Sequence, residues 1–100
     1  MENTSTERIV SIAAAQKEYF NTGATLNIAF RKQMLKKLLD ALEKWDDKLA
    51  DALWADLHKS YEEAYLTEIS IVKAEIRGHL KNVAKWARKK SVCTPIKLFP

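Results

Sequence analysis

Glycine, proline and cysteine are all scarce in this chain. Its 100 residues include two glycines, two prolines and one cysteine. Tight β-turns depend on glycine, so these counts exclude a two-sheet β-protein, and they exclude collagen-like and low-complexity chains as well. Both prolines, Pro95 and Pro100, stand at the end of the chain, which leaves almost all of it free to be helical. The predicted fold class is all-α.

Residues that carry chemistry are few and scattered. The single cysteine, Cys93, excludes an internal disulfide and a multi-cysteine zinc site, and it has no general base nearby in the sequence. His58 and His79 lie on different predicted helices and show no metal-ligand spacing. The acidic residues in the middle of the chain alternate with lysines, as on a solvated helix face; they are Asp46, Asp47, Asp51 and Asp56. We predict no catalytic, cofactor-binding or metal-binding residue in this chain.

The chain also lacks long apolar runs. No stretch approaches the roughly 20 apolar residues that a membrane span needs. Residues 1–7 have neither the basic start nor the apolar run of a signal peptide. We therefore expect a cytoplasmic protein without a membrane span.

Apolar residues recur every three or four positions over most of the sequence, which predicts amphipathic helices over about 6–22, 26–44, 46–58 and 61–90. A break of the last helix near residue 71 is left open by the pattern. Thr4 and Glu7 have capping-box spacing, and Gly23 suits a left-handed helix end. Since Asp favours an N-cap, Trp45–Asp47 predicts a joint between the second and third helices, which we expect to be nearly collinear.

The last helix and the tail carry three further signals. Ser60 and Glu63 form a second capping box. Gly78 is expected to let a neighbouring helix approach closely, because a helix-interior glycine otherwise costs about 1 kcal/mol. Thr94 before Pro95 predicts an extended tail over 91–100. The apolar end of this tail leads us to expect that the sequence is cut in mid-protein.

The net charge of +4 is unevenly distributed, because every charged residue after Glu75 is basic. Residues 81–90, with Trp86 among lysines, would suit nucleic acid or an anionic membrane surface. A charge of +4 is small for a nucleic-acid-binding protein, however, so we favour the solvated face of an amphipathic helix and expect no nucleic-acid partner.

Several short motifs stand in a fixed order along the chain. They are Phe20-Asn21-Thr22-Gly23, Phe30-Arg31, Ala55-Asp56-Leu57-His58-Lys59-Ser60, Glu63-Ala64-Tyr65-Leu66-Thr67-Glu68-Ile69, Glu75-Ile76, Leu80, Trp86 and Thr94-Pro95. This ordered set resembles the N-terminal segment of NAD(P)-dependent aldehyde dehydrogenases, above all the class 3, fatty-aldehyde type. The resemblance runs from about Ala15 to Pro95.

The resemblance implies that a longer parent enzyme oxidises aldehydes to carboxylic acids with NAD or NADP. Its nucleophilic cysteine, glutamate base, oxyanion-stabilising asparagine and cofactor loop would all lie downstream, and Cys93 lacks the Gly-Gln-x-Cys surroundings of the nucleophile. Residues 1–90 would be a helical layer that packs on the cofactor-binding domain, and residues 91–100 would lead into that domain. The chain alone should be inactive and bind no cofactor.

The expected partners are the cofactor-binding and catalytic domains of the parent chain. On its own, the chain should expose unmatched apolar surface and self-associate, with exchange of helices between copies as one route. Two alternatives are kept: an independent helical protein-interaction module, and a small basic nucleic-acid-binding protein.

Overall fold

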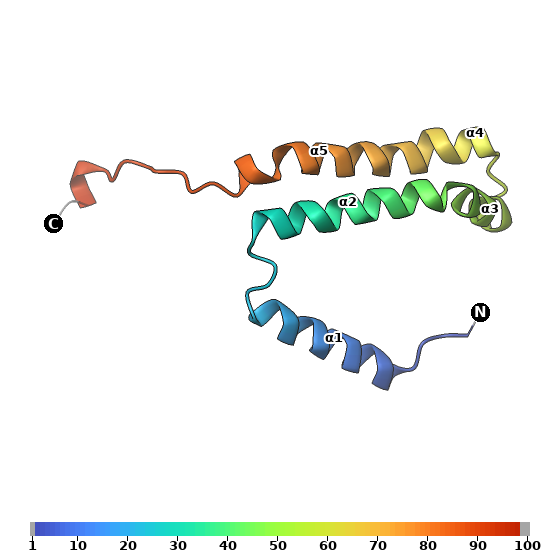
Figure 1. Cartoon of the computed structure of the whole chain (residues 1–100), viewed down its shortest axis with the longest axis horizontal. Coiled ribbons are helices and arrows are strands. Elements are labelled where there is room, and N and C mark those ends of the chain that lie inside the picture. The colour runs from blue at the N-terminus through green and yellow to red at the C-terminus, as the bar shows by residue number, and fades with distance from the viewer. Residues whose placement is uncertain (1, 99–100) are drawn as a thin grey trace.

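The computed structural model describes residues 2–98, and the regular structure in that range is entirely helical (Figure 1), which confirms the all-α prediction. Phe99 and Pro100, at the end of the predicted tail, lie outside the described residues. The elements are α1 (Thr6–Asn21), α2 (Ile28–Lys44), α3 (Asp46–Leu57), α4 (Tyr61–Ala64), the π-helical η1 (Tyr65–Ile69), α5 (Ser70–Trp86) and the short 3-10 turn η2 (Ile96–Leu98).

The helices form an elongated, open arrangement (Figure 1). Helices α2 and α5 lie side by side, while α1 stands apart from them and the tail runs away from the end of α5. The radius of gyration is 20.0 Å, against about 13 Å for a compact domain of 100 residues. Much of the surface that a compact domain would bury is therefore exposed.

Side-chain caps set three of the helix starts. Ser5, rather than the predicted Thr4, caps α1 by accepting a hydrogen bond from the Arg8 amide. Asn27 accepts one from the Phe30 amide at 3.1 Å, so α2 begins at Ile28 and not at residue 26. Ser60 accepts one from the Glu63 amide at 3.2 Å, as the second capping box predicts. Gly23 has a φ of +79°, the left-handed conformation predicted for the end of α1.

Helices α2 and α3 are separate, as predicted, but they are not collinear. The chain turns at Trp45, and Figure 1 views α3 down its axis while α2 lies across the page. No side chain caps the start of α3. The turn brings the start of α3 against α5, where Asp46 finds a partner.

From Tyr61 to Trp86 the chain is helical without a break. The irregularity left open near residue 71 is a π-helical turn at Tyr65–Ile69. The helix ends at Trp86, four positions before the predicted end at Lys90. The residues that follow, Arg88–Lys90, are exposed cations in a row, so neither packing nor charge favours another helical turn.

The core is small and lies where α2, α3 and the α4–α5 segment meet. Its buried apolar side chains are Leu39, Ala50, Ala64, Ile69 and Ile76. No residue of α1 is buried. Outside this junction many large apolar side chains are half exposed or more, among them Trp54, Trp86 and Ile71.

A buried ion pair crosses the same junction. Lys73, on α5, places its Nζ 2.7 Å from Asp46 Oδ2 at the start of α3, and only 7% of the lysine side chain is exposed. The Tyr65 ring lies 5.6 Å from the same Nζ. The hydrogen bond to Asp46 raises the pKa of Lys73. Because that pKa is raised, the stabilisation is complete at neutral pH and is lost only as the pH rises past the lysine range.

We predict that Lys73→Met lowers the free energy of unfolding by about 2 kcal/mol, because the Asp46 carboxylate then stays buried without a counter-charge. The control is Lys36→Met, which breaks an ion pair with Asp40 whose side chains are both more than half exposed and should shift stability far less. Urea unfolding followed by circular dichroism measures both. Equal shifts would contradict the role given to the buried pair.

The two glycines should respond in opposite directions to replacement by alanine. The expected close approach at Gly78 is wrong, since a Cβ built there meets no atom within 4 Å. Gly78→Ala should therefore stabilise the chain by about 0.5–1 kcal/mol through helix propensity. Gly23→Ala should destabilise it, because its φ of +79° strains an L-residue. Thermal unfolding of the two variants measures both changes. A lower unfolding temperature for Gly78→Ala would contradict the prediction, because it would mean that the added methyl group meets a neighbouring atom.

Candidate functional site

The side chains that could carry catalysis stay apart in the fold. His58 ends α3 with a positive φ of 53°, and its ring lies 5.2 Å from that of Trp54. His79 contacts the Glu75 carbonyl within α5, and Cys93 is exposed in the tail. Within residues 2–98, no three His, Cys, Asp or Glu side chains come close enough together to hold a metal ion.

The environment of Asp46 differs from the prediction. The alternation of acids and lysines predicts a solvated face, whereas in the structure Asp46 pairs with Lys73 and only 21% of its side chain is exposed. One of its oxygens, Oδ1, is buried and has no hydrogen-bond partner among the described residues. A signal was available: Lys73 lies four positions after Ile69 and three before Ile76, on the apolar face of its own helix.

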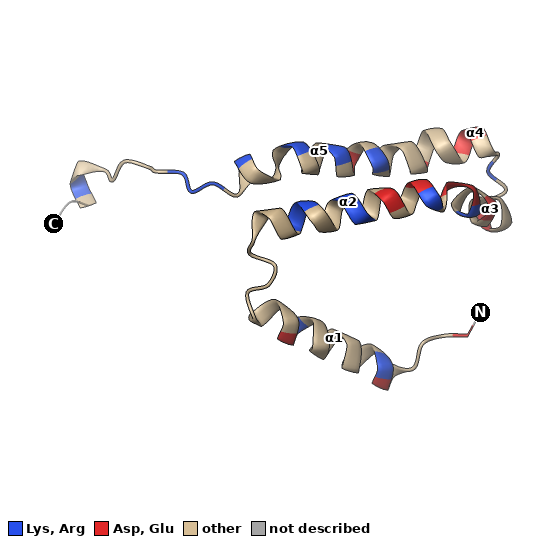
Figure 2. Ribbon diagram, in the orientation of Figure 1, with Lys and Arg blue, Asp and Glu red and all other residues tan. Residues whose placement is uncertain are grey.

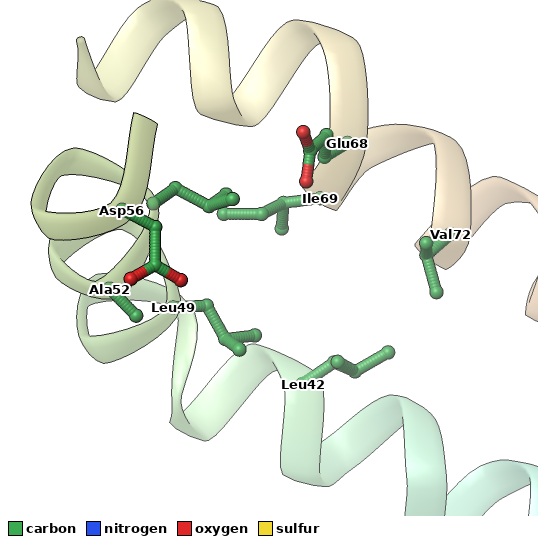
Figure 3. A pocket seen from close by; sticks show the side chains of 8 residues that line it. Leu42, Leu49, Ala52, Asp56, Glu68, Ile69 and Val72 are labelled. Atoms are coloured by element: carbon green, nitrogen blue, oxygen red, sulfur yellow. The ribbon is translucent and has the colours of Figure 1, made fainter. Parts of the chain in front are cut away.

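An apolar hollow opens next to this ion pair, between the end of α2, α3 and the start of α5. We call it the α3 hollow; its volume is about 260 Å³. Figure 3 shows aliphatic side chains converging on it from α2, α3 and α5, with the carboxylates of Asp56 and Glu68 beside them. Glu68 is already paired with Lys59. The lining residues are Leu42, Leu49, Ala52, Leu53, Asp56, Glu68, Ile69 and Val72.

A second apolar hollow lies toward the other end of α2. This α2 hollow has a volume of about 410 Å³. Its two polar side chains are Thr25 and Arg31, and the Arg31 Nε donates a hydrogen bond to the Thr25 carbonyl at 2.6 Å. The lining residues are Thr25, Phe30, Arg31, Met34, Leu35, Leu38 and Val83.

The basic residues of the second half of the chain are spread along α5 and the tail (Figure 2). Two of those on α5 face acids of the neighbouring elements: Lys73 pairs with Asp46, and Arg77 lies 3.2 Å from Glu43. Lys81 and Lys85 are on the half of α5 nearer the tail, and Trp86 beside them is 60% exposed. Part of the basic charge is therefore neutralised within the fold.

The two hollows have the properties of docking surfaces. Among the described residues, neither hollow is lined by a serine, cysteine or histidine. Both are apolar and open, and covering an apolar surface of this kind with another surface lowers the free energy. Among residues 2–98, no helix has both the length and the apolarity to cross a membrane.

Comparison with known proteins identifies the relatives of this chain, although no family model matches it. It is 43% identical over 84 residues to a 4,4'-diaponeurosporen-aldehyde dehydrogenase of Staphylococcus aureus, an alignment that covers 84% of this chain and 18% of the relative. It is 34% identical over 85 residues to a dimeric NADP-preferring aldehyde dehydrogenase of Canis lupus familiaris, covering 85% of this chain and 19% of the relative.

A third relative is aldehyde dehydrogenase family 3 member B1 of Rattus norvegicus, 37% identical over 76 residues, which is 76% of this chain and 16% of the relative. The chain thus spans less than a fifth of the length of these three relatives. Over most of its own length, the chain is a homologue of the aldehyde dehydrogenases, including members of family 3.

Proposed function

We propose that this chain is the N-terminal helical segment of a longer NAD(P)-dependent aldehyde dehydrogenase, and that it serves as a structural layer on the cofactor-binding domain. The observation that carries the proposal is the match to under a fifth of each relative's length. The parent would oxidise aldehydes to carboxylic acids, with its catalytic residues outside this chain.

The described residues offer no fit for the nicotinamide cofactor. A dinucleotide pyrophosphate is commonly held by a glycine-rich turn at the start of a helix. Here Gly78 is inside α5, and Gly23 is a single glycine in the connection between α1 and α2, so no glycine-rich turn precedes a helix in residues 2–98. We therefore assign NAD or NADP to the remainder of the parent chain.

The α3 hollow is the surface through which the segment would dock on the rest of the enzyme. It lies beside the buried core, so its position is held by the Lys73–Asp46 pair and by Ile69. Burial of its aliphatic side chains would contribute about 25 cal/mol for each Å² removed from water. Asp56, which forms no ion pair within residues 2–98, would favour a basic residue in the covering element.

We further propose that the parent is cytoplasmic and oligomeric. The free, exposed Cys93 suits a reducing compartment, and one relative is described as dimeric.

A pair of alanines on α3 tests the docking role. Ala52 lines the α3 hollow and Ala55 does not, and both are exposed in the chain alone. In a chimera where this segment replaces the aligned part of the Staphylococcus aureus relative, Ala52→Glu should lower aldehyde-dependent NAD(P)H formation by at least about tenfold, because a carboxylate would be buried in the interface. Ala55→Glu should retain the activity of the unmodified chimera.

Circular dichroism of the two variants in the 100-residue chain provides the control. Both should unfold at the same midpoint, since neither side chain is packed there. Equal activity of the two chimeras would refute docking through the α3 hollow, and an inactive unmodified chimera would count against the proposed function as a whole.

The nucleic-acid alternative makes a separate prediction. If residues 81–90 bound duplex DNA, the affinity would fall steeply with salt and Lys81→Glu/Lys85→Glu would weaken it. We expect no specific binding at physiological ionic strength, because a net charge of +4 is small for a nucleic-acid-binding protein. Fluorescence anisotropy with a labelled duplex measures this, and salt-sensitive binding of micromolar strength would favour the alternative.

A further inference from the structure

We propose that α1 of one copy packs into the α2 hollow of a second copy, and that the second copy returns the same contact. The α2 hollow is distinct from the α3 hollow of the proposed function. In solution, its occupant is a second copy of the chain.

Helix α1 requires a partner that its own chain does not provide. A helix of 16 residues is marginal in water on its own, so most of its stability must come from packing of an apolar face. Yet α1 has no buried residue. Its large apolar side chains range from 44% exposed at Ile12 to 63% at Phe20. The apolar stripe, spaced by threes, fours and sevens, is Ile9, Ile12, Ala13, Tyr19 and Phe20.

The α2 hollow has the matching properties. It is formed by the exposed side of α2 together with Val83 of α5, and Leu38 within it is 50% exposed. The hollow follows the first half of α2, from Phe30 to Leu38, and α1, with 16 residues, is long enough to lie along it. Apolar side chains on both surfaces lose water when they meet.

The connection between α1 and α2 holds α1 away from the hollow of its own chain. Thr22 donates its hydroxyl to the Tyr19 carbonyl at 2.6 Å, and Gly23 turns the backbone with a φ of +79°. The Leu26 amide then bonds to the Gly23 carbonyl, and Arg31 holds the Thr25 carbonyl. Folding α1 back on α2 would break these bonds. A second copy can use the same surface with the connection intact, which is the usual basis of helix exchange.

The area gained reaches the lower limit for a specific dimer. Four half-exposed side chains of the stripe would bury about 400 Å² for each α1, and the hollow that receives them loses a smaller area. Two reciprocal contacts then bury about 1,000 Å², close to the smallest area of a specific protein interface. A single contact of this kind would fall short, so the reciprocal arrangement is the one that the areas support.

Paramagnetic relaxation between copies tests the contact directly. A spin label is attached to Ala14→Cys in a Cys93→Ser background, since Ala14 lies on the polar side of α1, opposite the apolar stripe. This protein is mixed with an isotope-labelled chain that carries no spin label. The amides of Met34, Leu38 and Val83 in the isotope-labelled chain should broaden. Broadening of these amides only when both labels are on one chain would show that α1 folds back on itself and would overturn the proposal.

Two neighbouring alanines supply the matched variants. Ala13→Asp places a carboxylate on the apolar stripe, whereas Ala14→Asp places it on the polar side with Ser11 and Glu18. Light scattering across a concentration series should show a dimer for the unmodified 100-residue chain and for Ala14→Asp. For Ala13→Asp the dissociation constant should rise at least about a hundredfold, because each dimer loses the contact twice. The inference would be overturned if the unmodified 100-residue chain stayed monomeric at every concentration, or if the two variants changed the dissociation constant equally. Neither result would change the outcome of the chimera experiment, which tests the α3 hollow. Failure of the dimer proposal can therefore be told apart from failure of the proposed function.

Discussion

The ion pair between Lys73 and Asp46 is the interaction on which the rest of this fold depends. It joins α5 to the corner between α2 and α3, and its atoms are 2.7 Å apart in a site that leaves 7% of the lysine side chain exposed. The apolar core around it is small, so the folded segment cannot rely on hydrophobic burial alone. Burial also means that the loss of either partner is destabilising, because the remaining charge would be desolvated without a counter-charge. The pair therefore holds one arrangement of the helices, and with it the position of the α3 hollow.

Much of the secondary structure could be predicted because the signals are local. Asn27, Ser60 and Gly23 act through hydrogen bonds and backbone preferences that extend over a single helical turn. The features that escaped prediction depend on distant partners. Asp46 turns inward because Lys73 is on a helix far along the chain, and the π-helical turn at Tyr65–Ile69 has no signature in the spacing of apolar residues.

The candidate site shows the same division. Scarce glycine, one cysteine and two separated histidines led us to expect no catalytic residue in this chain, which stays a prediction. The structure places Cys93 in the tail and the two histidines on different helices. The apolar stripes were visible in the sequence, but which part of each stripe is covered was not, because this depends on how the helices pack. Ile69 and Ile76 are buried, whereas the stripe of α1 and both hollows are open. The homology to a much longer enzyme gives these open surfaces a physical meaning, because the rest of such an enzyme could cover them.

The central claim is that this chain folds around one junction and leaves its remaining apolar surface for other surfaces to cover. Amide hydrogen exchange tests it most directly, measured on the dilute chain alone and on the same segment within the chimeric enzyme. In the chain alone, the amides around Leu39, Ile69 and Ile76 should be protected, while those of α1 exchange at close to the rate of an unfolded peptide. Within the enzyme, the amides of α3 that border the α3 hollow should become more protected. Equal protection of α3 in the two settings, or strong protection of α1 in a dilute monomer, would contradict the account.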